Sequence, residues 1–204
     1  MVEPRRVLAV FDFDGTIVGR GSLPRFAVHL AGWRAAGALL PGAAAVARLL
    51  DPAAFKTHAL RDLLIDRDAA EVERRAASFA DRLLQSSLEP RTVERLRWHT
   101  RLGHPVVVVT SALDVYVVPV ATALGADDVI ASEVVVANGR CTGEVRDASL
   151  RRRRKVEAVE RWILETGLLE PEVYAYGDSR GDRELVEWAC ATRTRGRRAA
   201  DRRR

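Results

Sequence analysis

The chain has 204 residues and a mass of 22.5 kDa, which suits one medium-sized domain or one domain with a smaller insert. Apolar residues make up 48% of it and charged residues 30%, so disordered, collagen-like and coiled-coil chains are excluded. The two cysteines, Cys141 and Cys190, are too few for a disulfide scaffold or an all-cysteine zinc site and favour a reducing compartment.

The formal net charge of +5 comes from the C-terminal end. Residues 191–204 contain seven arginines and one aspartate, whereas the rest of the chain carries 26 basic and 27 acidic groups. Such a run predicts a solvated, disordered tail. Tail charge alone gives non-specific binding to polyanions, so no specific nucleic-acid partner is expected.

No segment predicts secretion or membrane insertion. The apolar run near the N-terminus, residues 7–11, is only five residues long and ends in acids, unlike a signal peptide. The longest apolar region, 35–50, is broken by Pro41 and Arg48 and is shorter than the roughly 20 residues of a membrane helix. We therefore expect a soluble, cytoplasmic protein without a transmembrane segment.

The N-terminal half is predicted to be one strand followed by helices. Residues 6–13 read as a short buried strand that ends in a turn at Asp14-Gly15. Residues 21–86 contain no strand-like run and are rich in alanine, leucine and arginine, which predicts a helical insert. Expected helices begin near Ser22, near Pro52, at about 68 and after Pro90.

The C-terminal half alternates strands and helices. The β-branched run PVVVVT at 105–110 predicts a strand buried on both faces of a parallel sheet. The expected elements after it are a helix at 114–125, a hairpin at 133–146 turning at Asn138-Gly139, a helix at 152–166, a strand at 173–176 and a helix from 182. This order predicts an α/β fold with helices on both faces of the sheet.

Polar residues follow three of the predicted strands, namely Asp12, Thr110 and Asp178. Ligands of parallel sheets bind beyond the carboxyl ends of the strands. Asp12 and Asp14 point to the same side, and such a pair suits a nucleophile beside an acid/base with a divalent cation. The alternative is an Asx-turn at Gly15.

The other candidates have structural alternatives too. Asp178 could bind a metal directly, and Asp182 could orient that metal or a bound water without binding the metal itself. The alternative is that Ser179 or Asp182 caps the following helix. Thr110 and Ser111 could hold phosphate oxygens or act as a plain N-cap. Lys155 follows four arginines and could neutralise a phosphoryl group, or lie on a solvated helix face.

Taken in order, FDFDGT, Thr110, Lys155 and YGDSRGD resemble the four motifs of the haloacid dehalogenase-like (HAD) superfamily. The segment VVVVTSALDVYVVPVATALGADDVIASEVVVANGRCTGEV and the helical insert are similar to subfamily IB, the phosphoserine-phosphatase-like hydrolases. The resemblance covers roughly residues 6–190. It implies a Rossmann-like core at 1–20 and 87–190, an all-helical C1 cap at 21–86 and an arginine-rich tail at 191–204.

The resemblance also implies roles. Asp12 would attack phosphorus and form an aspartyl-phosphate, and Asp14 would protonate the leaving oxygen and later deprotonate water. Mg²⁺ would be bound by the side chains of Asp12 and Asp178 and by the backbone carbonyl of Asp14. Asp182 would lie beyond these direct ligands. Thr110, Ser111 and Lys155 would hold the phosphoryl oxygens.

Two departures from the family pattern matter. Most phosphoserine phosphatases have Asp-Ser-Thr and Ser-Gly-Gly where this chain has Asp-Gly-Thr and Thr-Ser-Ala, which leaves the substrate open. After Cys190 the chain runs into arginines, so the outermost C-terminal strand is expected to be missing, as in a truncated or frame-shifted chain.

The expected function is Mg²⁺-dependent hydrolysis of a phosphomonoester, either a small molecule or a lipid phosphate. Candidate binders of anionic substrate groups in the cap are Arg25, Lys56, His58 and Arg61, although residue types of this kind are more often ordinary solvated surface residues. Two alternatives remain: a phosphotransferase on the same scaffold, and a non-catalytic HAD-like protein with a polyanion-binding tail. The oligomeric state is not predicted.

Overall fold

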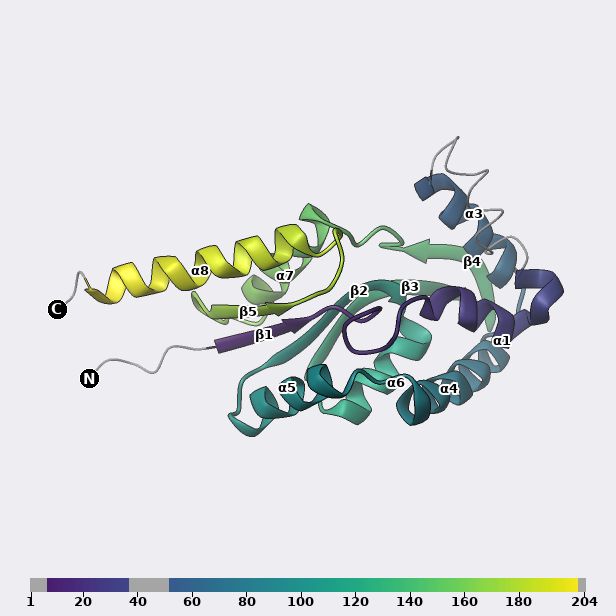
Figure 1. The fold of residues 1–204 in the computed structure, drawn as a ribbon. Coiled ribbons are helices and arrows are strands. Elements are labelled where there is room, and N and C mark those ends of the chain that lie inside the picture. The colour runs from purple at the N-terminus through teal and green to yellow at the C-terminus, as the bar shows by residue number, and fades with distance from the viewer. Residues whose placement is uncertain (1–6, 37–51, 202–204) are drawn as a thin grey trace.

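A computed structural model describes residues 7–36 and 52–201, with side chains described over 7–32 and 56–192. The central element is a five-stranded sheet in the order β4-β3-β2-β1-β5 (Figure 1). Its strands are β1 Val7–Phe11, β2 Val106–Leu113, β3 Asp128–Ala137, β4 Arg140–Arg146 and β5 Glu172–Tyr176. β1 pairs in parallel with both β2 and β5, β2 pairs in parallel with β3, and only β4 is antiparallel. The predicted α/β class is confirmed.

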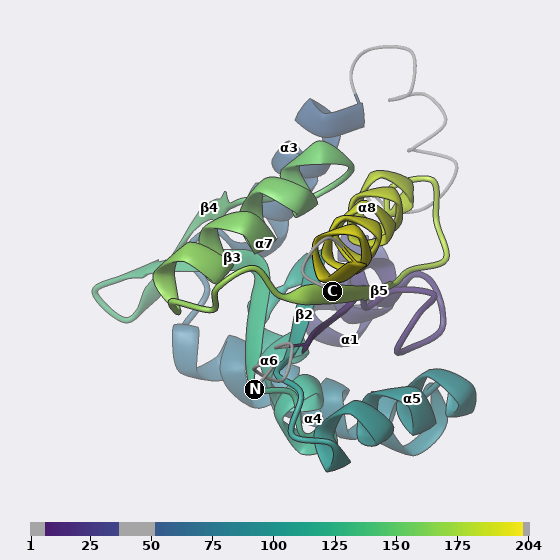
Figure 2. The ribbon, with the colours of Figure 1, turned by 90° about the vertical axis from the view of Figure 1, so that its left-hand side faces the viewer.

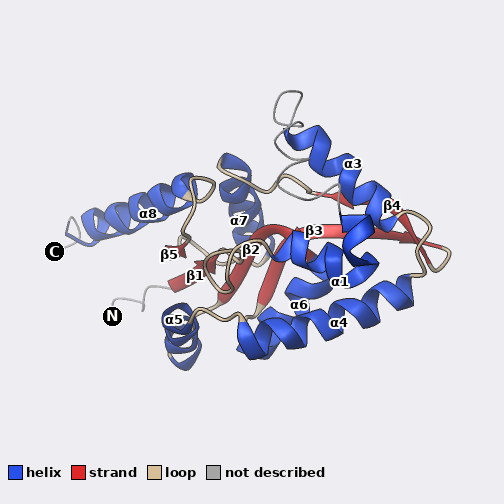
Figure 3. Ribbon diagram, turned by 45° about the vertical axis from the view of Figure 1, so that its right-hand side comes forward, coloured by secondary structure: helices blue, strands red, loops and turns tan. Residues whose placement is uncertain are grey.

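Helices cover both faces of this sheet (Figures 1 and 2). They are α1 Ser22–Ala36, α3 Pro52–Leu64, α4 Ala69–Ser86, α5 Pro90–Arg101, α6 Asp114–Leu124, α7 Arg153–Glu165 and α8 Arg183–Asp201. In Figure 3 the strands lie between α7 and α8 on one side and α4, α5 and α6 on the other.

Alternation along β1 feeds two separate cores. Leu8 and Val10 belong to the apolar cluster under α7 and α8, whereas Ala9 and Phe11 belong to the larger cluster on the opposite face. All four side chains are fully buried, because successive residues of a strand point to opposite faces. β1 is therefore fixed from both sides, and so is the position of the residue that follows it.

The regular elements described between β1 and α5 are the helices α1, α3 and α4. α3 packs against β4, and α4 packs against α6. Phe26 of α1, Phe79 of α4 and Tyr116 of α6 form an aromatic cluster, with the Phe26 and Tyr116 ring centroids 4.9 Å apart. The helical insert is thus continuous with the core of the sheet, and the domain limits at 20/21 and 86/87 stay a prediction.

The hairpin is where the sequence places it. Asn138 and Gly139, with φ values of 51° and 75°, form the connection between β3 and β4, and two consecutive positive φ values fit the tight hairpin turn that Asn-Gly favours. The strand before it is longer than expected, because β3 begins at Asp128 and its first residues pair with β2. The mixed polar and apolar residues at its start hide this pairing in the sequence.

The C-terminal helix extends into the predicted tail. The sequence predicts a disordered tail over residues 191–204, whereas α8 continues through Asp201. Leu185 and Ala189 bury the first turns of α8 in the core, and the alanines and arginines that follow favour propagation of a helix already begun. β5 is an edge strand in the described part of the chain. None of the described helices is long and apolar enough to cross a membrane.

The last turn of α5 contains a buried imidazole, that of His99. His99 has no exposed surface, and its Nδ1 and Nε2 lie 2.9 Å from His104 Nδ1 and from the Tyr176 hydroxyl oxygen. Burial, together with the charges of His104 and Arg95, lowers the pKa of His99 to about 4. The neutral imidazole is therefore the form that the folded protein accommodates.

This burial predicts an acid-sensitive stability. Between the ordinary histidine pKa of about 6.5 and the folded value of about 4, only the unfolded chain binds the proton, so the free energy of unfolding falls as pH falls through that window. From about pH 7.5 to about pH 5 we expect wild type to lose up to about 2 kcal/mol more than His99→Asn, measured by urea unfolding. Identical pH dependence in the two proteins would contradict this.

Candidate active site

The polar residues predicted from three strand ends meet in one pocket. The pocket has a volume of about 1040 Å³ and lies at the carboxyl ends of β1, β2 and β5. Its lining includes every residue expected to act on the phosphoryl group or the metal: Asp12, Asp14, Thr110, Ser111, Lys155, Asp178 and Asp182. Chain segments up to 170 residues apart in sequence therefore supply one site.

Asp12 lies at the floor of the pocket directly after β1. Its backbone N–H donates to the Tyr176 carbonyl oxygen at 2.8 Å, which continues the pairing of β1 with β5. The residue is 5% exposed, and its Oδ2 lies 3.4 Å from the Thr16 hydroxyl. The backbone register thus fixes this carboxylate before any ligand binds.

Lys155 joins two carboxylates. Its Nζ, brought by the first turns of α7, donates to Asp12 Oδ1 and to Asp182 Oδ1, each at 2.5 Å, and all three residues are at most 5% exposed. The second oxygen of Asp182 accepts from the backbone N–H and the hydroxyl of Ser179. With both of its oxygens occupied, Asp182 is suited to positioning Lys155 rather than to binding a ligand directly.

Burial changes the acidity of the two N-terminal carboxyls. Burial and the nearby charge of Asp182 raise the pKa of Asp12 to about 6, against the lowering effect of Lys155. Burial also raises the pKa of Asp14, although hydrogen bonds from Ser22 oppose the rise. A raised pKa keeps a carboxyl protonated closer to neutral pH, as a proton donor requires.

Asp14 is held by the start of α1. Its Oδ1 accepts from the Ser22 backbone N–H at 2.8 Å and its Oδ2 from the Ser22 hydroxyl at 2.9 Å. The Ser22 hydroxyl is itself 2.9 Å from the Tyr116 hydroxyl, which is fully buried. Ser22 and Tyr116 orient this carboxyl, and the sequence analysis missed that role because only tertiary packing brings α1 and α6 together.

The acidic groups could hold a divalent cation. Single carboxylate oxygens of Asp12, Asp178 and Asp182 lie within 4.8 Å of one another, and all-oxygen donors are what Mg²⁺ prefers. Gly15 makes room for this arrangement, since a Cβ at its φ of 82° would lie 2.5 Å from Asp178 Oδ2. The residues present therefore fit a Mg²⁺ ion with Asp12 and Asp178 as its carboxylate ligands, and these carboxylates also accept from Lys155 and from Arg20, respectively.

Thr110 and Ser111 lie near the carboxyl end of β2, beside Asp12. Thr110 is 2% exposed, and its hydroxyl oxygen accepts from the Ala112 backbone N–H at 3.1 Å. This bond leaves the hydroxyl hydrogen available to another acceptor. The predicted phosphate-binding residues of β2 and α7 thus line the same pocket wall as the nucleophile candidate.

The predicted cap residues lie outside the pocket lining. Arg25 is exposed on α1 and donates to the Ser87 hydroxyl at 2.7 Å. Lys56 of α3 donates to the carbonyl oxygens of Ser111 and Ala148, each at 2.8 Å, and therefore joins the insert to the core. Arg61, like His58, is exposed on α3, and its side chain lies over Gly143 of β4.

Three other arginines line the pocket instead: Arg20, Arg151 and Arg180. Arg20 donates to Asp178 Oδ2 through Nε, at 2.8 Å, and through Nη2. No sequence signal singled out Arg20 between its two glycines. Arg151 belongs to the run of five successive cations that ends at Lys155. Because neighbouring side chains of such a run point in different directions, the sequence predicts that at most one or two of them face any one site.

The family follows from a comparison with family models. The model described as haloacid dehalogenase-like hydrolase matches residues 9–187. The chain belongs to this family. Protein CicA of Caulobacter vibrioides is 32% identical to it over 187 residues, which are 88% of this chain and 82% of that protein.

Other relatives are phosphatases or share the fold. Phosphoserine phosphatase of Methanocaldococcus jannaschii is 25% identical over 191 residues, covering 92% of this chain and 84% of that protein. A Bordetella pertussis protein of unknown function has a solved structure with a TM-score of 0.78 and 27% identity over 90% of this chain and 87% of that one. These matches confirm the predicted HAD family, its phosphoserine-phosphatase-like branch and an enzyme of the HAD-like phosphatase type.

The contact at Gly15 predicts a selective loss of cation binding. Ala at position 15 would strain a positive φ and push Asp178 away, whereas Gly139→Ala strains a similar φ of 75° with no atom within 4 Å of the new Cβ. We expect each substitution to cost about 1–2 kcal/mol of stability. Only Gly15→Ala should weaken Mg²⁺ binding, by at least about tenfold (roughly 1.4 kcal/mol).

Thermal unfolding and titration calorimetry with Mg²⁺ would measure the two effects separately. Equal Mg²⁺ affinity in Gly15→Ala and Gly139→Ala would contradict the role assigned to the Gly15 contact.

Proposed function

We propose that the protein is a Mg²⁺-dependent phosphomonoester hydrolase that acts through an aspartyl-phosphate on Asp12. The observation that carries the proposal is the arrangement around Asp12: a buried carboxylate held by the Lys155 ammonium, next to Asp178, with Asp14 two residues along the chain. A buried carboxylate, a fixed positive charge and a second carboxyl in one pocket support this proposal, because phosphoryl transfer depends on positioning and charge neutralisation.

Asp12 and Asp178, with the Asp14 backbone carbonyl, are the groups proposed to hold Mg²⁺. When bound, the cation neutralises charge on the phosphoryl group and on Asp12, which keeps Asp12 ionised as a nucleophile. The fit rests on the grouping of carboxylate oxygens and on the space that Gly15 leaves for Asp178.

In the first step an oxygen of Asp12 forms a bond to phosphorus while the bond from phosphorus to the leaving oxygen breaks. Protonated Asp14 donates its proton to that leaving oxygen, so the alcohol departs neutral. The raised pKa of Asp14 favours the protonated form that this step needs. Lys155, Thr110 and Ser111 hold the phosphoryl oxygens in place.

In the second step ionised Asp14 takes a proton from a water molecule, and the water oxygen attacks phosphorus. The bond between phosphorus and the Asp12 oxygen breaks, which releases inorganic phosphate and restores both carboxyls. Ser22 holds Asp14 through both carboxyl oxygens, so the same group is oriented for both proton transfers.

The proposed substrates are small phosphate esters or a lipid phosphate, in a cytoplasmic setting. Support for ester hydrolysis comes from the family match and from a relative named phosphoserine phosphatase. The substitution of the usual serine by Gly15 in the first motif, and of Ser-Gly-Gly by Thr110-Ser111-Ala112, favours an ester other than phosphoserine.

Replacing the nucleophile tests the reaction. Asp12→Asn should lower kcat for p-nitrophenyl phosphate in the presence of Mg²⁺ by at least about 1,000-fold, because no covalent intermediate can form. Asp81→Asn, an exposed carboxyl on α4, is the matched control and should keep wild-type turnover. Undiminished hydrolysis by Asp12→Asn would exclude the mechanism.

Replacing the acid/base should separate the two steps. The p-nitrophenolate leaving group needs little protonation, so Asp14→Asn should still transfer the phosphoryl group to Asp12. Hydrolysis of the resulting aspartyl-phosphate should be slower by about 100-fold or more, because Asp14 no longer deprotonates the water. Intact-protein mass spectrometry of the quenched reaction should then detect one added phosphoryl group. A variant that is slow yet carries no phosphoryl group would argue against the assigned role of Asp14.

A further inference from the structure

The pocket is far larger than the group that the proposed chemistry transfers. Its volume of about 1040 Å³ is at the upper end of small-molecule sites, whereas the residues around Asp12 occupy only its floor. The remaining lining must therefore contact the leaving group, which is the alcohol portion of the phosphate ester. The charges on that lining determine which leaving portions it favours.

Two of the arginines that line the pocket have unneutralised side chains. The guanidinium groups of Arg151 and Arg180 make no hydrogen bond or ion pair with any other residue whose side chain the structure describes. Nearby arginines are different, since Arg153 pairs with Glu157 and Arg183 pairs with Glu187. Both unneutralised arginines are exposed and come from loops rather than from regular elements.

The backbone holds these two loops together. The N–H of Arg152, the residue after Arg151, donates to the carbonyl oxygen of Gly181, the residue after Arg180, at 2.7 Å. Arg151 lies before α7 and Arg180 lies between β5 and α8. The hydrogen bond therefore places both arginines on the same part of the pocket rim.

The acids of the pocket are held by other groups rather than by these two arginines. Asp12 and Asp182 accept from Lys155, Asp14 from Ser22, and Asp178 from Arg20. Among the residues that the structure describes, these four carboxylates are the acids that line the pocket.

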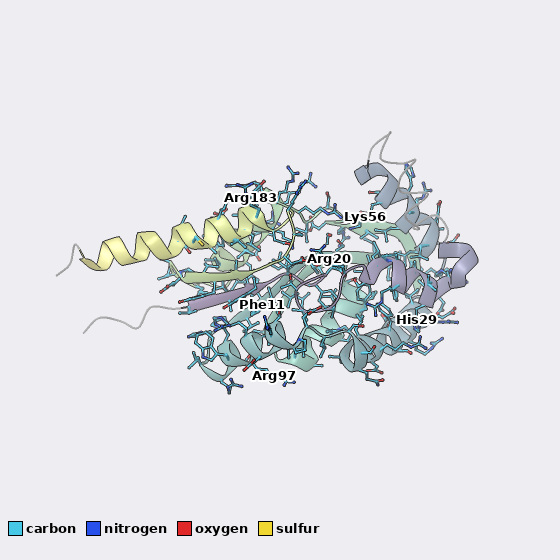
Figure 4. All side chains as sticks on the ribbon, in the orientation of Figure 1. Phe11, Arg20, His29, Lys56, Arg97 and Arg183 are labelled. Carbon is cyan, nitrogen blue, oxygen red and sulfur yellow. The ribbon has the colours of Figure 1, made fainter. Side chains whose placement is uncertain are left out.

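Lys56 adds a third positive charge on the same side. Its Nζ donates to the carbonyl oxygen of Ala148, three residues before Arg151. Burial and the charge of Arg151 lower the pKa of Lys56 to about 8. Lys56 lies on α3, above the core, as the label in Figure 4 shows, so the positive region extends toward the insert.

We propose that Arg151 and Arg180 form an anion-binding subsite on the pocket rim, which selects phosphate esters whose leaving portion carries a second negative group, a carboxylate or a further phosphate. This inference rests on the proposed function. A guanidinium suits the role because its planar donors match carboxylate and phosphate oxygens in pairs. Because both side chains are exposed, each contributes a modest part of the selectivity.

Esters that differ only at the far end test the subsite. Glycerol 3-phosphate has a neutral hydroxyl there, 3-phosphoglycerate a carboxylate and glycerol 1,3-bisphosphate a second phosphate. For wild type with Mg²⁺ we expect kcat/KM at least about tenfold higher for one or both anionic esters than for glycerol 3-phosphate. The two anionic arms distinguish a carboxylate from a phosphate.

Removing each arginine should remove the preference alone. Arg151→Gln and Arg180→Gln should each lower the ratio of kcat/KM for the preferred anionic ester to that for glycerol 3-phosphate by about fivefold. Turnover of glycerol 3-phosphate should change by less than about twofold. Arg154→Gln, an exposed arginine of the same basic run outside the pocket lining, is the control and should keep the wild-type ratio.

Three results would overturn the subsite: equal kcat/KM for all three esters, a preference that survives in both variants, or the same loss in Arg154→Gln. Failure of the proposed function is distinguishable from these, because wild type would then hydrolyse neither p-nitrophenyl phosphate nor any of the three esters.

Discussion

The site depends on one buried ammonium group between two carboxylates. Asp12 and Asp182 come from opposite ends of the chain, and each would be costly to bury as an ion without a partner. Lys155 satisfies both at 2.5 Å, so α7, the end of β1 and the start of α8 are fixed relative to one another. Removing this ammonium would leave two adjacent buried carboxylates, so the same contacts hold the floor of the pocket and the fold of this region together.

Around this bridge, each further residue is held by a short local contact. The register of β1 with β5 sets the Asp12 backbone, the absence of a Cβ at Gly15 lets Asp178 approach, and Ser22 holds Asp14. These contacts make the pocket floor rigid before substrate arrives, so little reorganisation is required during phosphoryl transfer. The rim, in contrast, consists of exposed arginines on loops, where selectivity can vary without disturbing the chemistry.

The sequence could predict the floor but not the rim. Asp12, Thr110 and Asp178 follow apolar runs, and parallel strands place their carboxyl ends together, so local pattern was sufficient. Lys155 needed the family resemblance, since four arginines precede it and local pattern does not say which cation faces inward. Arg20 with Asp178, and Ser22 with Tyr116, depend on contacts between residues 158 and 94 positions apart. The extent of α8 beyond residue 190 does not follow from the local sequence, because a basic run is typical of a solvated tail, whereas a helix already packed against the core can propagate through it.

The hydroxyl of Ser22 has one more consequence. Ser22 is the first residue of α1, where the chain leaves the sheet for the inserted helices, and it also holds the Asp14 carboxyl and meets Tyr116 of the core. Any rotation of α1 about its first turn would therefore also move the Asp14 carboxyl, the proposed proton donor. The position of the inserted helices and the orientation of this carboxyl are thus coupled through one side chain, that of Ser22.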